Sequence, residues 1–154
     1  MIEIAPYRIE HLEQVYEIER LSFSVPWSKG IFADIPELNW VKFFVALENN
    51  AAVENNAVVG YCGMNHVLDE GEIINIAVHP DYRSQGIGDL MMREMITYSE
   101  TNDIVLLMLE VRKSNTVARR LYEKYGFYEV GIRPKYYTKP DEDAVLMNKD
   151  IKFF

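Results

Sequence analysis

The segment from Glu72 to Glu100 constrains the fold more than any other part of the chain, because it joins an apolar strand, a glycine turn and a helix. EIINIAVHP is short and apolar, as a buried strand is. The stretch that begins at Gly86 repeats apolar residues at helical spacing, and the turn RSQGIG carries Arg83, Gly86 and Gly88. A strand that leads through glycines into a helix N-terminus aligns several backbone N–H groups. The segment therefore predicts an α/β fold with an anion-binding turn in its middle.

This turn differs from two better-known phosphate loops. A P-loop requires GxxxxGK followed by Ser or Thr, and the chain lacks that pattern here. A dinucleotide fingerprint needs a third small residue, where GIGDLM has Met91. Taken alone, Gly86 and Gly88 favour a plain strand-to-helix turn in which glycine serves only the backbone geometry.

Further strands and helices are expected on both sides of this segment. Their apolar patterns predict strands near 3–7, 43–47, 57–67, 104–111, 127–133 and 144–149. Helical spacing predicts helices from Ile9 to the SFSVPWSKG break, near 31–35, and from a Ser114 or Asn115 cap to Gly126. The polar stretch ENNAAVENNA is expected to be a hairpin loop, and KYYTKPDED to connect the last two strands. The predicted order is mixed α/β.

Two helices show a clear apolar side. In the first, the residues expected to face inward are Ile9, Leu12, Val15, Tyr16 and Ile18, while the outer side carries Glu10, Glu13 and Glu17. In the last, the inward residues are Val117, Ala118, Leu121, Tyr122 and Tyr125.

Composition narrows the class of protein. A chain of 154 residues is expected to form one domain, over 1–154, with its own core. The net charge of −8 argues against a broad nucleic-acid surface, and no apolar stretch approaches the roughly 20 residues of a membrane span. The single cysteine, Cys62, allows no intramolecular disulfide, and no signal peptide is expected at the N-terminus, where no charged leader precedes an apolar run. We expect a cytoplasmic protein that binds neither membranes nor nucleic acid.

Two longer motifs resemble the GCN5-related N-acetyltransferase (GNAT) family. NIAVHPDYR with RSQGIG fits the R/Q-x-x-G-x-G/A turn of that family, and LEVRKSNTVARRLYEKYGF resembles the second half of its acetyl-coenzyme A site. The motifs SVPW, LEVRKSN and YYTKPDEDAVLM further resemble the RimI/Ard1 branch of protein N-terminal acetyltransferases. The match keeps its order over nearly the whole chain, which makes it far more specific than one glycine pattern.

The resemblance implies the GNAT fold: a twisted, mostly antiparallel mixed sheet of about seven strands, with a splayed parallel pair and about four flanking helices. It also implies acetyl-coenzyme A as co-substrate and no metal. The residues implied in coenzyme binding lie on the strand, in the turn and on the following helix: Ile76, Ala77, Val78, Arg83, Ser84, Gln85, Gly86, Ile87, Gly88, Asp89, Asn115, Ala118 and Tyr122.

Transfer of acetyl from a thioester to an amine requires a base for the amine and a proton for the leaving thiolate. Glu110 interrupts an apolar strand, a placement that raises a carboxylate pKa, and it is the expected base, acting through a water. The structural alternative is a salt bridge between Glu110 and Arg112. Glu72 is a second candidate base, or else a solvated strand-end charge. Tyr122 matches the tyrosine of the family's LYE motif and is the expected acid, with core packing as the alternative.

The acceptor is expected between the SVPW loop, with Val25, Pro26 and Trp27, and the hairpin that carries Tyr136 and Tyr137. The two tyrosines can hydrogen-bond a peptide backbone while their rings enclose an α-amine. The resemblance thus implies N-terminal amines of proteins as substrates, with ribosomal or nascent chains as candidates.

Other functions stay open at this point. The same fold can acetylate a lysine side chain or a small amine, and a coenzyme A-binding subunit without catalysis is a third hypothesis. Cys62 is expected to be a small buried thiol rather than an acyl carrier, so direct transfer in a ternary complex is favoured. The histidines show no spacing typical of a metal site.

Overall fold

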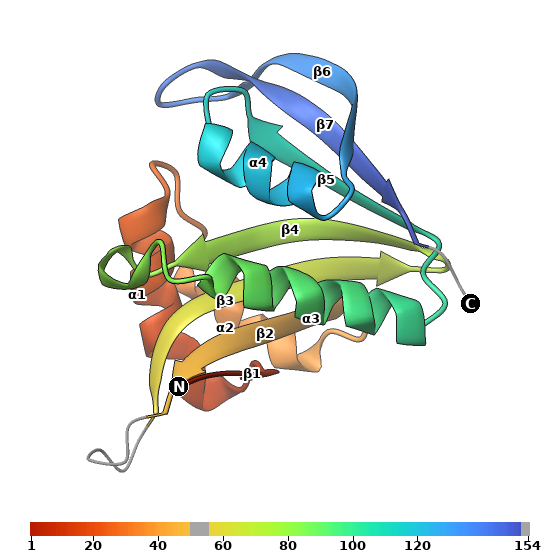
Figure 1. The fold of residues 1–154 in the computed structure, drawn as a ribbon. Coiled ribbons are helices and arrows are strands. Elements are labelled where there is room, and N and C mark those ends of the chain that lie inside the picture. Colours follow the sequence, from red (N-terminus) through yellow and green to blue (C-terminus); the bar gives the residue numbers. More distant parts are fainter. Residues whose placement is uncertain (50–55, 152–154) are drawn as a thin grey trace.

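One seven-stranded sheet runs through the computed structural model, which describes residues 1–49 and 56–151 (Figure 1). The spatial order of the strands is β1-β2-β3-β4-β5-β7-β6. Their bounds are β1 Ile2–Pro6, β2 Val41–Glu48, β3 Ala57–Val67, β4 Glu70–Val78, β5 Leu106–Arg112, β6 Tyr128–Tyr137 and β7 Glu142–Asp150. Neighbours are antiparallel except β4 and β5, which are parallel. The mixed, mostly antiparallel sheet implied by the family resemblance is confirmed.

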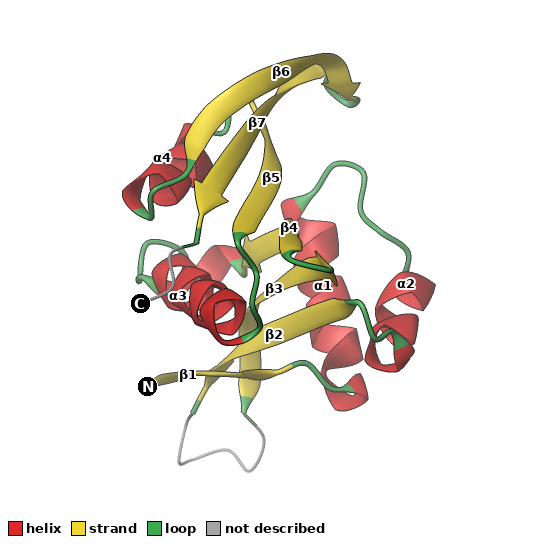
Figure 2. Ribbon diagram, turned by 90° about the vertical axis from the view of Figure 1, so that its right-hand side faces the viewer, coloured by secondary structure: helices red, strands yellow, loops and turns green. Residues whose placement is uncertain are grey.

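In the described part of the chain, four α-helices cover the two faces of this sheet: α1 Leu12–Ser22, α2 Lys29–Asp34, α3 Ile87–Thr101 and α4 Thr116–Lys124. Figure 2 shows α1 and α2 on one face of β1 to β4, with α3 on the opposite face and α4 against the β5–β7 part. Each face has its own apolar core. Met91, Met95 and Leu107 are fully buried on the α3 side, and Val15 and Phe32 on the α1 side.

The last helix shows how local sequence sets an element. The side chain of Asn115 accepts a hydrogen bond from the Ala118 N–H at 3.2 Å and so caps α4. Gly126 lies just beyond the helix with a φ of +91°, a conformation that glycine adopts without strain. Of the two caps considered from the sequence, the structure selects Asn115.

The C-terminal hairpin differs from the sequence prediction. The segment near Tyr136 and Tyr137 was expected to lie in the connection, but β6 continues to Tyr137, which pairs with Glu142. The register shifts between Arg133 and Tyr137, so a local irregularity separates two paired parts of one strand. A pattern of alternation cannot be followed through such an irregularity, which is why the sequence suggested an earlier end.

Two residues placed inward by helical spacing are in fact exposed: Ile9 to 50 % and Val117 to 80 %. Both lie at a helix start, Ile9 in the 3-10 turn Ile9–His11 and Val117 in the first turn of α4, where the chain has not yet packed on the sheet. The polar hairpin loop expected at ENNAAVENNA falls mainly on residues 50–55, outside the described residues. No helix within 1–49 and 56–151 is long and apolar enough to cross a membrane.

Candidate active site

The parallel strands β4 and β5 separate halfway along their length. Within the described residues they pair only from Glu70 to Ile73 and from Leu106 to Leu109, although both strands continue beyond these pairs. The splayed pair implied by the family resemblance is therefore present. Beyond Ile73, β4 keeps its bonds to β3 up to Val78 but has none to β5, which leaves an extended edge toward the gap.

A cavity of about 790 Å³ lies at this separation. Residues of α1 and the following loop, β4, β5, α4 and the β6–β7 hairpin line it: Glu19, Ser22, Phe23, Ser24, Val25, Trp27, Ile73, Ile74, Asn75, Ile76, Leu109, Glu110, Val111, Arg112, Asn115, Ala118, Tyr122, Tyr136, Tyr137, Thr138, Lys139 and Pro140. Segments more than 100 residues apart in sequence thus meet at one place.

Glu110 reaches this cavity from β5, with its side chain 19 % exposed. Its carboxylate lies 3.3 Å from Nε of Arg133 on β6. The alternative partner considered from the sequence, Arg112, instead approaches Glu142 at 3.3 Å. The salt bridge proposed between Glu110 and Arg112 is therefore wrong, because the two side chains lead to different partners on the hairpin.

Tyr122 lines the same cavity from α4 and is 5 % exposed. Its ring also packs on Phe127, with the centroids 5.9 Å apart. Tyr122 therefore packs in the core, and the same side chain also reaches the cavity. Burial raises the pKa of its phenol above the ordinary value of 10.0, so the hydroxyl keeps its proton at neutral pH.

Glu72 is adjacent to this centre but does not line the cavity. It pairs in register with Met108, which is on the same face of β5 as Glu110. Burial raises the pKa of Glu72, the negative charge of Glu110 adds to the rise, and Arg133 opposes it. The two carboxylates therefore interact across the site, with Glu110 the one at the cavity.

The glycine turn lies at the far end of β4, between the 3-10 turn Pro80–Tyr82 and α3. The first bond within α3 runs from the Leu90 N–H to the Gly86 carbonyl oxygen at 3.2 Å, so the N–H groups of Ile87, Gly88 and Asp89 are the orphan donors of the helix end. The Arg83 side chain donates from Nε to the Val78 carbonyl oxygen at 3.2 Å. This end suits an anion, and the open edge of β4 leads from it to the cavity.

The two glycines of the turn serve different purposes. Gly86 has a φ of +78°, a conformation that glycine adopts without strain. A Cβ built there would meet nothing within 4 Å, so the backbone conformation, not a lack of space, explains the residue. A Cβ on Gly88 would lie 3.2 Å from Cδ2 of Leu121. The absence of a side chain at Gly88 therefore lets α4 pack close to the start of α3. The Asp89 carboxylate also faces α4, accepting from the Lys124 ammonium at 2.5 Å and the Tyr125 hydroxyl at 2.8 Å.

The loop between α1 and α2 forms one wall of the cavity. Val25 and Trp27 line it, whereas Pro26 does not. The Trp27 ring packs on Phe32 and Phe43, with centroids 5.6 Å and 6.5 Å away. This stretch, residues 23–27, is called the acceptor loop below.

The hairpin segment 136–140 forms the opposite wall. The rings of Tyr136 and Tyr137 meet edge to face with centroids 5.0 Å apart, and both residues line the cavity. Burial raises the pKa of Tyr137 to about 12, and the charge of Glu110 contributes. A hydrogen bond to Glu110 raises the pKa of Tyr136. Both phenols are therefore neutral donors beside the Glu110 carboxylate.

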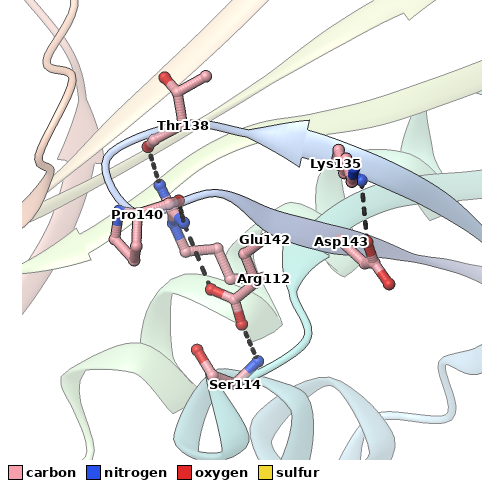
Figure 3. Close-up of polar contacts among 7 residues, drawn as sticks. All are labelled: Arg112, Ser114, Lys135, Thr138, Pro140, Glu142 and Asp143. Atoms are coloured by element: carbon pink, nitrogen blue, oxygen red, sulfur yellow. Dashed lines mark hydrogen bonds and ion pairs between the residues drawn. The ribbon is translucent and has the colours of Figure 1, made fainter.

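Arg112 holds this wall to β5 (Figure 3). Its guanidinium donates to the Thr138 and Pro140 carbonyl oxygens, at 2.8 Å and 2.9 Å, and stacks 4.6 Å from the Tyr137 ring centre. Glu142 accepts from Arg112 and, through its other oxygen, from the Ser114 N–H at 2.5 Å. The hairpin is thus joined both to β5 and to the start of α4.

Sequence reasoning missed the role of Arg112 and a buried group behind the acceptor loop, formed by Glu19, Tyr61 and Asn75. Glu19 falls four residues after Val15 on the apolar side of its helix, which was the available signal. Cys62 is buried, as predicted, and burial raises the pKa of its thiol. Across residues 1–49 and 56–151, no group of three or more His, Cys, Asp or Glu side chains is placed to hold a metal ion.

Comparisons with known proteins agree with this geometry. The model of the acetyltransferase (GNAT) family matches residues 12–127. The chain is 40 % identical over 138 residues to a ribosomal protein bS18-alanine N-acetyltransferase of Haemophilus influenzae, covering 88 % of this chain and 89 % of the relative.

Solved structures give the same result. The crystal structure of the ribosomal-protein-S18-alanine N-acetyltransferase from Escherichia coli superposes with a TM-score of 0.88 at 34 % identity, covering 100 % of this chain and 96 % of the other. Ard1 from Thermoplasma volcanium gives a TM-score of 0.83 at 26 % identity, covering 98 % of each chain.

Proposed function

Because the chain belongs to the GNAT family and is an acetyl-coenzyme A-dependent N-acetyltransferase, we propose that its acceptor is the N-terminal α-amine of a protein, with alanine of ribosomal protein bS18 as the leading candidate. The observation that carries this proposal is the cavity in which Glu110 and Tyr122 meet the acceptor loop and the tyrosine pair. Relatives of similar length are named for that substrate. The reaction then takes place in the cytoplasm, where ribosomal proteins are made.

The residues of the donor side suit an extended, anionic co-substrate. The orphan N–H groups at the start of α3 and the free space beside Gly86 suit a pyrophosphate. The edge of β4 at Ile76, Ala77 and Val78 offers backbone groups to a pantetheine arm, as a neighbouring strand would. Acetyl-coenzyme A supplies the activated acetyl thioester. We assign the turn residues 83–89 to its phosphate end, and Asn115 and Ala118, which line the cavity, to its sulfur end.

Glu110 is proposed as the base. An α-amine has a pKa of about 7.7–8.0, so a weak base positioned in the cavity suffices near neutral pH. Glu110 faces the cavity and Glu72 does not, which favours Glu110 for the proton and leaves Glu72 to act on it through charge. The Arg133 guanidinium at 3.3 Å holds the Glu110 carboxylate in place.

Tyr122 is proposed as the acid. The new bond joins the acceptor nitrogen to the acetyl carbon, the carbon–sulfur bond breaks, and the thiolate needs a proton. Tyr122 retains its proton because it is buried, and it reaches the cavity beside Asn115 and Ala118. The proton released by the amine goes to Glu110, and the one taken up by sulfur comes from Tyr122.

Peptide acetylation tests this function. The protein is incubated with acetyl-coenzyme A and three acceptors: an N-terminal bS18 peptide, the same peptide with a blocked N-terminus and an added lysine, and a small amine. Mass spectrometry locates the acetyl group. We expect transfer to the α-amine alone. Equal transfer to lysine would favour the side-chain alternative, and coenzyme binding without any transfer would favour a non-catalytic subunit.

A further inference from the structure

A buried carboxylate lies behind the acceptor loop. Glu19 of α1 is only 2 % exposed. One carboxylate oxygen accepts from the Tyr61 hydroxyl and from Nδ2 of Asn75 at 2.9 Å, and the other accepts from the Trp27 N–H at 2.7 Å. Nδ2 of Asn75 is also 3.1 Å from the Tyr61 hydroxyl oxygen. Three neutral donors thus surround one acidic side chain.

These contacts join the two halves of the site. Asn75 lies on β4 between Ile74 and Ile76, in the part of the strand that has separated from β5. Trp27 lies in the acceptor loop and lines the cavity. A single carboxylate therefore fixes the distance between the wall that the acceptor meets and the strand expected to bind the coenzyme.

Placing a carboxylate at a core position is energetically unfavourable. Its burial is unfavourable unless hydrogen bonds replace the lost water, and apolar residues of similar volume often give equal or better stability. Here the neighbours that satisfy it come from both halves of the site, and one of them is a loop N–H rather than a side chain. Holding a loop backbone is a task that an apolar residue cannot perform.

We propose that Glu19 is a positioning residue for specificity: it fixes Trp27 of the acceptor loop relative to β4, and so keeps the space for the first acceptor side chain small. This inference rests on the proposed function, because it takes that side chain to be the first residue of a protein. It adds a determinant of selectivity outside the reacting groups Glu110 and Tyr122.

Hydrogen exchange measures the positioning directly, in the protein without substrates. The Trp27 amide of the wild type is expected to be strongly protected. In Glu19→Gln, an amide nitrogen, which only donates, replaces one of the two accepting oxygens, so the side chain can no longer accept from both Trp27 and the Tyr61–Asn75 pair. Exchange in residues 23–28 should therefore accelerate by about tenfold or more, as for the loss of one hydrogen bond to a charged group. Glu17→Gln is the matched control, because Glu17 is on the same helix but exposed and paired with Arg20 at 2.7 Å.

Kinetics measures the specificity. In Glu19→Gln, the ratio of kcat/KM for an Ala-first peptide to that for a Leu-first peptide should fall by about tenfold, the scale of discrimination by pocket size. The KM for acetyl-coenzyme A should stay unchanged. Tyr61→Phe keeps the bond between Glu19 and Trp27, so it should retain most of the selectivity even if it lowers stability.

Three results would overturn the proposal. The first is an unprotected Trp27 amide in the wild type, a measurement that does not depend on a variant that folds. The second is equal loop exchange in Glu19→Gln and Glu17→Gln, and the third is unchanged selectivity in Glu19→Gln although its loop exchanges faster. A wild type that transfers acetyl to no peptide would instead contradict the proposed function, while the exchange experiment would still decide whether Glu19 holds the loop.

Discussion

The two walls of the cavity are held in opposite ways. The acceptor loop is fixed from inside, by a carboxylate that is 2 % exposed and bonded to neutral groups. The hairpin wall is fixed from outside, by an arginine that is 24 % exposed and bonded to carbonyl oxygens and Glu142. A buried bond is costly to break because nothing replaces it, whereas water compensates for a lost bond at the surface. Loss of the bonds that hold the loop wall should therefore lower the free energy of unfolding more than loss of the bonds that hold the hairpin wall.

The largest expected effect is on catalysis and concerns Glu110, which reaches the cavity between the two walls. Glu110→Gln should lower kcat for peptide acetylation by about 100-fold or more, because the amine loses its base. Steady-state kinetics with and without Glu72→Gln checks the assignment. We expect the Glu72 variant to lose far less, since Glu72 does not line the cavity. A larger loss in Glu72→Gln than in Glu110→Gln would reverse the two roles.

The second prediction compares how much each wall contributes to the free energy of unfolding. Glu19→Ala leaves the Tyr61 hydroxyl, the Asn75 amide and the Trp27 N–H without their acceptor, and should lower the free energy of unfolding by about 3 kcal/mol. Arg112→Ala should lower it by about 1 kcal/mol or less. Urea unfolding measures both. Equal losses would show that burial does not distinguish the walls.

The third prediction concerns the hairpin wall. Arg112→Lys keeps the charge but replaces the planar fork of the guanidinium by a compact ammonium, which cannot hold the same bonds in this geometry. KM for the peptide should therefore rise about fivefold, as for loss of about 1 kcal/mol of binding, with KM for acetyl-coenzyme A unchanged. Arg119→Lys is the matched control: Arg119 is 26 % exposed and donates to the Lys113 carbonyl oxygen at 2.9 Å, but does not line the cavity. A similar rise in both variants would contradict a role in positioning.

The smallest expected effect is a pH dependence of opposite sign for the two walls. Hydrogen bonds from Ser114, with the charge of Arg112, hold the pKa of Glu142 below the ordinary 4.5, so its stabilisation is present above pH 4.5 and is lost as pH falls through the folded-state pKa. Burial raises the pKa of Glu19, so its contribution is present below pH 4.5 and decreases as pH rises through the folded-state pKa.

Unfolding of the wild type, Glu142→Gln and Glu19→Gln between pH 3.5 and 7.5 tests these signs. The stability difference between wild type and Glu142→Gln should shrink toward acid, while that between wild type and Glu19→Gln should shift against the wild type toward neutral pH. Parallel trends would contradict the comparison.

The elements and the donor side were largely predictable from local sequence. Alternation and helical spacing located the strands and helices, Asn115 and Gly126 marked the ends of α4, and the splayed parallel pair followed from the family motif. The turn at Gly86 was predictable because a positive φ and a helix N-terminus are properties of a short segment.

What the sequence alone determined, then, is the fold, the family and the groups that can carry the chemistry, because these depend on residue type and spacing along the chain. Only the tertiary structure decided which of them meet. It paired Arg112 with Glu142 rather than Glu110, and it packed α4 against Gly88. It also extended β6 through Tyr137 and brought Glu19 to the Trp27 N–H. Each of these depends on where distant segments cross. The place where two distant segments meet is fixed by the packing of two apolar cores on a twisted sheet, and the periodicity within one segment does not predict it.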